Sequence, residues 1–142
     1  MRGQVSLDLL FAVAIIAITM LSVMNVALSE KTEADVLGTS AQLKAFAIDL
    51  RGTVARLYSS PGMTVIKESP IELGPDDSIN VTLTAGGYLR IRAHIGGREY
   101  VIVQKLQVPP GTTSSVLLTR AAPEFKVSSR RSPDGVQVVL ET

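Results

Sequence analysis

Hydrophobic positions divide the chain into three stretches with different spacing. Residues 9–29 form an apolar run that contains no charged residue. Over residues 36–57, apolar or small residues recur in steps of four and three, and from residue 63 onward apolar and polar residues alternate. A spacing near 3.6 residues predicts a helix and alternation predicts strands. The pattern therefore predicts a long helix followed by a β domain.

The apolar run is long enough to cross a membrane. At about 1.5 Å per residue, a helix over residues 9–29 spans roughly 30 Å, the thickness of the hydrocarbon core of a bilayer. Arg2 precedes the run, and mostly acidic residues follow it, namely Glu30, Lys31, Glu33 and Asp35. This charge bias predicts an N-terminus in the cytoplasm and the remainder of the chain outside.

The helical pattern continues beyond the apolar run. A stripe of apolar or small residues follows, made of Val36, Ser40, Leu43, Ala47, Leu50, Val54 and Leu57. The turn-forming segment Ser59-Ser60-Pro61-Gly62 ends it. We expect a helix from about Leu7 to Tyr58, within a helical region of residues 4–60, which lies first in lipid and then packs its stripe against the β domain.

The remaining sequence reads as short antiparallel strands. Strands are expected at residues 63–67, 79–83, 89–95, 100–106, 115–119, 124–128 and 136–140. Because residues 100–106 begin apolar on both faces, we expect that strand to be central. The predicted fold class is α+β, a long hydrophobic N-terminal helix followed by an antiparallel β-sandwich-like globular domain over residues 61–142.

Composition narrows the function classes. The chain has 142 residues, 46% of them hydrophobic, and a formal net charge of +1, so we expect no nucleic-acid partner. With no Cys and a single His, thiol chemistry and Cys-based zinc sites are excluded. We expect no enzymatic activity, no catalytic residue and no cofactor.

The β domain offers few candidate sites. His94 alternates with arginines on one strand face, and a lone His makes no metal site. Asp76-Asp77 lacks the spacing of a calcium loop and reads as a turn, so no bound metal is expected. The basic run Ser128-Ser129-Arg130-Arg131-Ser132 reads as a solvated loop, with an adhesive or lattice contact as the alternative. Asn80-Val81-Thr82 is an N-glycosylation sequon, and Asn80 lies on the polar side of its predicted strand, so it is a candidate acceptor for a glycan.

The first residues, Met1-Arg2-Gly3-Gln4-Val5-Ser6-Leu7-Asp8, carry a specific pattern. They resemble the archaeal class III signal peptide of type IV pilin-like proteins, in which a short leader ending in Gly precedes Gln-x-Ser-x-Glu and a hydrophobic helix. The resemblance implies a leader of residues 1–3, cleavage between Gly3 and Gln4 by a prepilin peptidase, and a processing motif of Gln4, Ser6 and Asp8. This chain has Asp8 where the family usually has Glu, a shorter side chain with the same charge.

The chemistry of Asp8 agrees with that resemblance. A carboxylate beside an apolar helix is costly in lipid or in a helical core unless it is paired. Cleavage at Gly3 would create an ammonium on Gln4, and in a staggered bundle the Asp8 of a neighbour can meet it. The alternative is an interfacial helix charge that the helix dipole favours.

The resemblance implies a structural pilin that polymerises through its helix into an archaeal surface filament for adhesion. Its implied partners are other copies of itself, the prepilin peptidase, the assembly ATPase and membrane platform, and the membrane before assembly. The precursor would lie in the cytoplasmic membrane and the product in an extracellular filament. Three alternatives remain: a plain membrane anchor; an anchored β-sandwich binding module resembling archaellum stator proteins; and a secreted domain cleaved after Ala27-Leu28-Ser29.

Overall fold

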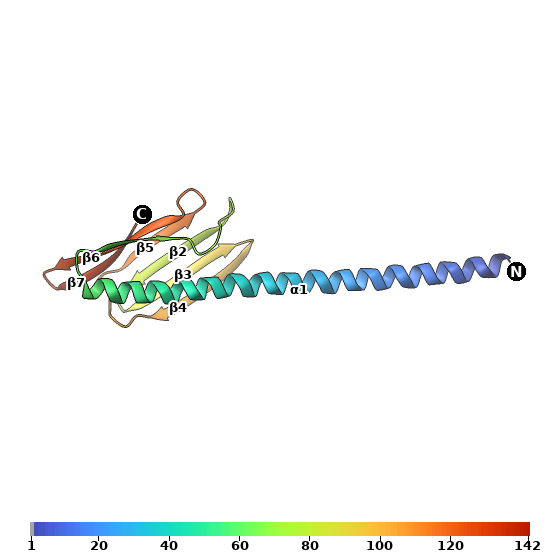
Figure 1. Ribbon diagram of the computed structural model, residues 1–142, viewed down its shortest axis with the longest axis horizontal. Helices are drawn as coiled ribbons and strands as arrows, with labels where there is room; N and C mark the ends of the chain where they lie inside the picture. The colour runs from blue at the N-terminus through green and yellow to red at the C-terminus, as the bar shows by residue number, and fades with distance from the viewer. Residues whose placement is uncertain (1) are drawn as a thin grey trace. The chain divides into compact units, whose positions relative to one another are not determined.

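The computed structural model contains one long helix followed by seven strands (Figure 1). It describes residues 2–142, with side chains from Ser6 onward. Met1 lies outside the described residues, and residues 2–5 are described by their backbone alone, so nothing is described of the first residue of the predicted leader or of the side chain of Gln4. The elements are α1 (Arg2–Ser59), β1 (Thr64–Glu68), β2 (Ser78–Thr84), β3 (Tyr88–Ile95), β4 (Arg98–Lys105), β5 (Ser114–Thr119), β6 (Glu124–Ser132) and β7 (Gly135–Glu141).

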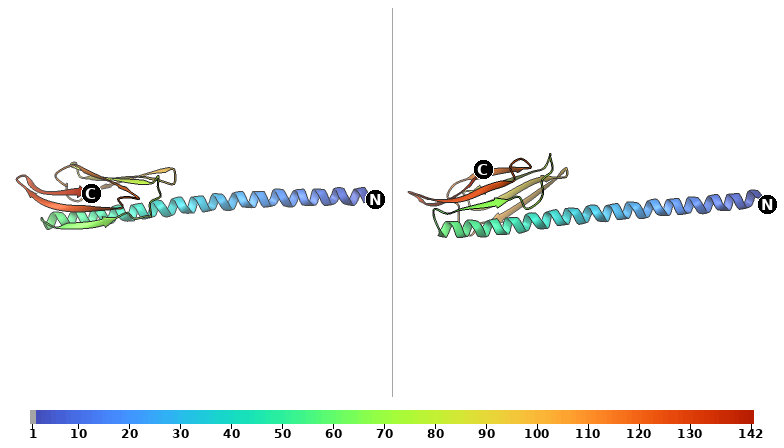
Figure 2. Two further views of the ribbon diagram at one scale, coloured as in Figure 1. Left: turned by 90° about the horizontal axis from the view of Figure 1, so that it is seen from above. Right: turned by 45° about the horizontal axis from the view of Figure 1, so that its top comes forward.

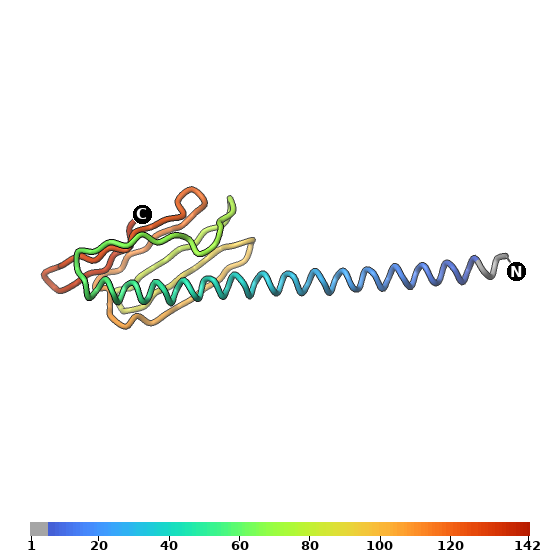
Figure 3. The backbone as a smooth tube through the Cα atoms, viewed as in Figure 1, coloured from blue at the N-terminus to red at the C-terminus, as the bar shows by residue number. Residues whose placement is uncertain are grey.

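The chain divides into two compact units, Met1–Gly38 and Thr39–Thr142. Figure 3 follows the backbone through α1 into the strands. The first unit consists of the early part of α1. The second unit, called the β domain below, contains the last part of α1 and all seven strands.

The strands form two antiparallel sheets. The three-stranded sheet has the order β1-β6-β7, and the four-stranded sheet has the order β4-β3-β2-β5. Tight turns connect β2 to β3 and β3 to β4, and in both turns glycines take positive φ angles, 89° at Gly87 and 76° at Gly97. Residues other than glycine rarely adopt this backbone conformation, so the glycines make these short hairpins possible.

The two sheets approach each other on the side of β5 and β7. The backbone N–H of Leu140 donates to Ser114 Oγ, at 3.0 Å, and the N–H of Val138 donates to the carbonyl oxygen of Pro110, at 2.9 Å. On the other side, β1 and β4 flank the last part of α1 (Figures 1 and 2). Lys67 of β1 pairs with Asp49, and Arg51 donates to Gln104 of β4, so α1 closes the open side of the sheets.

The core of the β domain lies between this part of α1 and the inner faces of both sheets. The predicted helical stripe is buried from Leu43 through Ala47, Leu50, Val54 and Leu57, whereas Val36 and Ser40 are only half-buried. On the strands, alternate residues are buried, as in β3, where Leu89, Ile91 and Ala93 point inward. The predicted α+β architecture of a helix packed on antiparallel sheets is therefore confirmed.

Two local predictions were wrong. The strand predicted over residues 100–106 as central is β4, an end strand of its sheet. Its side chains Val101 and Val103 are apolar but about half exposed, so the apolar character of this strand does not reflect burial on both faces.

The basic run that was predicted as a solvated loop lies within β6. Ser128 and Ser129 are buried there, and Ser129 Oγ donates to the carbonyl oxygen of Ser60 at 3.0 Å. Pairing with β1 and β7 satisfies the backbone of this polar segment, which is why it extends the strand.

Candidate assembly site

The apolar run of α1, residues 9–29, is apolar on every side and is not covered by other parts of the structure. All residues from Ser6 to Asp35 are exposed. Leu9, Leu10 and Phe11 are consecutive and thus point in different directions around the helix, yet each exposes more than 60% of its surface. The helix is long and apolar enough to span a membrane, by length and composition. A helix that is apolar all round requires lipid or other helices as surroundings.

Two hydroxyls inside the apolar segment are satisfied by their own helix. Thr19 Oγ1 donates to the carbonyl oxygen of Ile15 at 2.8 Å, and Ser22 Oγ donates to that of Ile18 at 2.9 Å. Such bonds to the preceding turn remove the cost of placing a hydroxyl in an apolar medium. The hydroxyls of Thr19 and Ser22 are therefore compatible with a lipid environment.

Asp8 lies on α1, close to the start of the apolar run, and its side chain is exposed. None of the three ion pairs found among the described residues involves it. Its predicted partner is the amine that cleavage would create on Gln4, whose side chain lies outside the described residues. The predicted cleavage point between Gly3 and Gln4 lies in the backbone of α1. Ser6, the second of the three residues of the predicted processing motif, is exposed on the same helix. The role of these residues stays a prediction.

Asn80 lies on β2, an inner strand of the four-stranded sheet. Its side chain is half-buried on the outer face of the sheet, opposite Arg92 on one side and Leu117 on the other. The hydroxyl of Thr82 donates to Asn80 Oδ1 at 2.9 Å, so the two polar residues of the sequon lie together on one face. A glycan on Asn80 stays a prediction.

Asp77 joins two turns of the β domain. Its carboxylate accepts a hydrogen bond from the backbone N–H of Gly96 and another from that of Gly74, each at 2.9 Å. These two bonds, with a smaller contribution from the positive charge of His94, hold the pKa of Asp77 below its ordinary value. Because both oxygens are already engaged, Asp77 is a structural link between turns.

Among the described residues, no group of three or more His, Asp or Glu side chains is arranged to hold a metal ion. His94 lies on the exposed outer face of β3 and is paired in register with Glu99 and Ser78.

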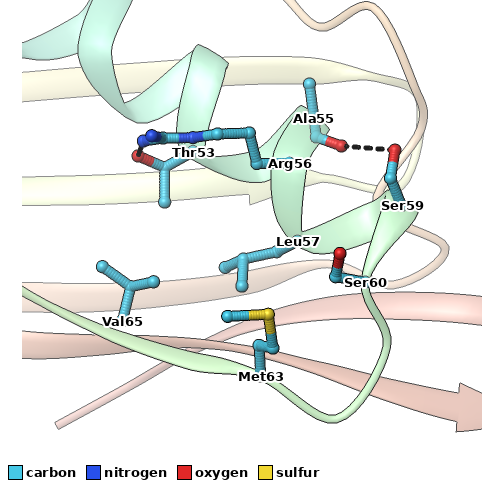
Figure 4. Close-up of a pocket in the computed structure, with 8 residues that line it drawn as sticks. All are labelled: Thr53, Ala55, Arg56, Leu57, Ser59, Ser60, Met63 and Val65. Carbon is cyan, nitrogen blue, oxygen red and sulfur yellow. Dashed lines mark hydrogen bonds between the residues drawn. The ribbon is translucent and has the colours of Figure 1, made fainter.

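One groove was not predicted from the sequence. It has a volume of about 670 Å³ and lies between the end of α1 and β1, where Leu57, Met63 and Val65 line it (Figure 4). Two of its polar side chains are already engaged, since Arg56 donates to Thr53 Oγ1 and Ser59 donates to the carbonyl oxygen of Ala55. The groove thus offers apolar surface but no reactive group.

A search of family models, of curated proteins and of solved structures found no match to this chain. The architecture is nonetheless pilin-like, with a long apolar N-terminal helix followed by antiparallel β-sheets. The exposed apolar segment indicates membrane association or a signal sequence. Its exposed apolar surface suggests an interface with a membrane or with other copies of the chain.

Proposed function

We propose that this chain is the structural subunit of an archaeal type IV pilus-like surface filament. The observation that carries the proposal is the division of α1, which is exposed and apolar over residues 9–29 and packs its apolar stripe into the β domain from Leu43 onward. A subunit of this form can hold its β domain folded while a long apolar segment remains available to other copies.

Processing would convert the membrane precursor into an assembly unit. A prepilin peptidase would hydrolyse the peptide bond between Gly3 and Gln4, which releases the leader and leaves a free amine on Gln4. The apolar helix stays on the product, unlike the helix of a secreted protein. The precursor would reside in the cytoplasmic membrane with its N-terminus inside, and assembly would use an ATPase and membrane platform proteins.

Assembly would replace lipid contacts of the helix by contacts with other helices. Dispersion and close packing then stabilise the bundle, and small residues such as Ala12, Ala14 and Ala17 permit close approach. The carboxylate of Asp8 would pair with the Gln4 amine of a neighbour. An ion pair in an apolar core is costly to break, so this pairing would select one axial step between subunits. The filament would serve adhesion at the cell surface.

The first experiment is to shear cells, collect the high-molecular-weight surface fraction and determine the N-terminal peptide of this protein by mass spectrometry. A peptide that begins at Gln4 in filament-containing material supports the proposal. A protein that stays in the membrane and begins at Met1 or Arg2 would instead be an anchored binding module of the stator-like kind. A soluble form that begins at Glu30 would mean secretion.

A further inference from the structure

The outer side of β3 and β4 carries apolar and basic side chains together. This surface, called the basic face below, consists of Tyr88, Arg90, Val101, Val103 and Lys105. Its three large apolar side chains are each about half exposed, at 48% for Tyr88, 53% for Val101 and 50% for Val103. The outer face of an antiparallel sheet is usually polar, so grouped apolar side chains here indicate a contact surface.

Charge on the basic face is available to a partner. Arg92, the neighbouring arginine, is paired with Glu99 at 3.1 Å, but no ion pair found among the described residues includes Arg90 or Lys105. Arg90, Val103 and Tyr88 also border a surface hollow of about 450 Å³, which would admit side chains of a partner.

A second surface has the opposite charge. This acidic face consists of Ile66, Glu68, Glu72 and Glu124, at β1, the start of β6 and the segment after β1. One exposed ammonium, that of Lys126, lies on the same side of the sheet opposite Ile66, so the carboxylates outnumber the cations. Glu68, Glu72 and Glu124 line a hollow of about 450 Å³ that contains one basic side chain, Arg120. Ile66 is 61% exposed and adds apolar surface beside the carboxylates.

The acidic face carries an unfavourable internal contact. Glu68 and Glu124 are directly opposite each other in the register of β1 and β6, and both are exposed. Like charges in opposed positions destabilise a sheet. No ion pair found in the described part of the chain relieves either carboxylate. Arg120 and Lys126 lie near these carboxylates, but neither is in an ion pair found among the described residues, so a further cation from outside the chain would relieve this repulsion.

The two faces are arranged so that both can be used at once. β1 and β4 lie on either side of the last part of α1, and their outer faces point away from it (Figures 1 and 2). When two different surfaces of identical subunits meet, one copy of each surface stays free at the two ends of the assembly. Such head-to-tail contacts generate open chains when they do not close into a ring.

We propose that the basic face of one copy docks onto the acidic face of a second copy, with Arg90 placed against the Glu68–Glu124 pair and the exposed valines against Ile66. A second copy is the occupant that the structure favours because the same chain carries both complementary surfaces, each with apolar side chains beside its charges. The inference rests on the proposed function, since it describes how β domains meet in the filament.

Engineered cysteines test this contact directly, because the chain contains no cysteine of its own. The full-length double variant Ile66→Cys with Val103→Cys is expressed in cells, and the sheared filament fraction is run on a non-reducing gel. We expect a ladder of dimers, trimers and higher species that reduction removes. The matched pair Val103→Cys with Arg131→Cys, which moves one cysteine to another exposed position, should give no ladder.

A charge reversal tests whether the opposite charges of the two faces, and not only the position of the cysteines, produce the ladder. Arg90→Glu in the double-cysteine background should reduce the ladder by about tenfold or more, because like charges then face each other. Adding Glu68→Arg should restore it. Failure of this reciprocal swap to restore the ladder would argue against the assigned orientation.

Failure of the inference differs from failure of the proposed function. Normal filaments with no ladder overturn the contact but leave the filament proposal standing. Absence of any filament from the wild-type chain removes both.

The mass of the Asn80 peptide from filaments is a second test: a fully glycosylated peptide contradicts the contact, because Asn80 lies on the same outer sheet face, opposite Arg92.

Discussion

The rings of Phe46 and Phe125 meet edge to face, with centroids 6.2 Å apart and planes inclined by 78°. Phe46 comes from α1 and Phe125 from β6, and both are buried. This geometry suits the charge distribution of aromatic rings and adds to the apolar area that each ring removes from water. The contact packs the last part of α1 against the three-stranded sheet.

Phe125→Ala is expected to destabilise the β domain by about 3–5 kcal/mol, since it removes a fully buried ring and leaves a cavity. The loss of stability is measured as a shift of the urea midpoint of the full chain in detergent, where pulse proteolysis reports the unfolding of the β domain. Tyr88→Ala is the matched control, because that ring is about half exposed and should cost far less. Equal effects of the two substitutions would contradict the assigned packing.

Asp77→Asn should lower stability at neutral pH by about 1 kcal/mol, because an amide cannot accept both backbone hydrogen bonds. The folded state holds the pKa of Asp77 below its ordinary value, so the stabilisation is present above that value and is lost as the pH falls through the folded pKa. Wild-type stability should therefore decline below about pH 4. The variant should decline less over this range. Asp76→Asn serves as control, and a variant with the wild-type pH profile would contradict the role of Asp77.

Gly3→Leu should block removal of the leader, because the peptidase would have to accommodate a branched side chain next to the scissile bond. Mass spectrometry of the membrane and sheared fractions reports the N-terminal peptide. Gly38→Leu is the control, since it makes the same exchange at an exposed helical position with open space around it. Normal processing of the Gly3 variant would count strongly against the pilin assignment.

Asp8→Ala should insert into the membrane, but its filament yield should fall about tenfold or more, because the neighbour's Gln4 amine would lie unpaired in an apolar core. Asp8→Glu, which keeps the charge, should retain assembly. Asp35→Ala removes an exposed acid elsewhere on α1 and should leave the yield unchanged. Yields are compared by immunoblot of sheared fractions, and a wild-type yield from Asp8→Ala would leave the pairing without support.

The elements themselves could be predicted from the sequence because their signals are local. Apolar spacing indicated α1 and its buried stripe from Leu43 to Leu57, and glycine turns with alternation located all seven strands to within a few residues. The segment with the pilin-like processing pattern and its acid, Asp8, were also apparent at this level, although the geometry of the described residues leaves their roles as predictions.

Only the tertiary structure decided which strands are neighbours and which side chains meet. Val101 and Val103 read as core residues, but β4 is an end strand, and strand order depends on pairings between residues far apart in sequence. Ser128 and Ser129 read as loop residues until pairing with β1 and β7 buried them. The opposition of Glu68 and Glu124 likewise follows from register alone. Local spacing determines which residues form a helix or a strand, whereas long-range packing determines what each surface faces.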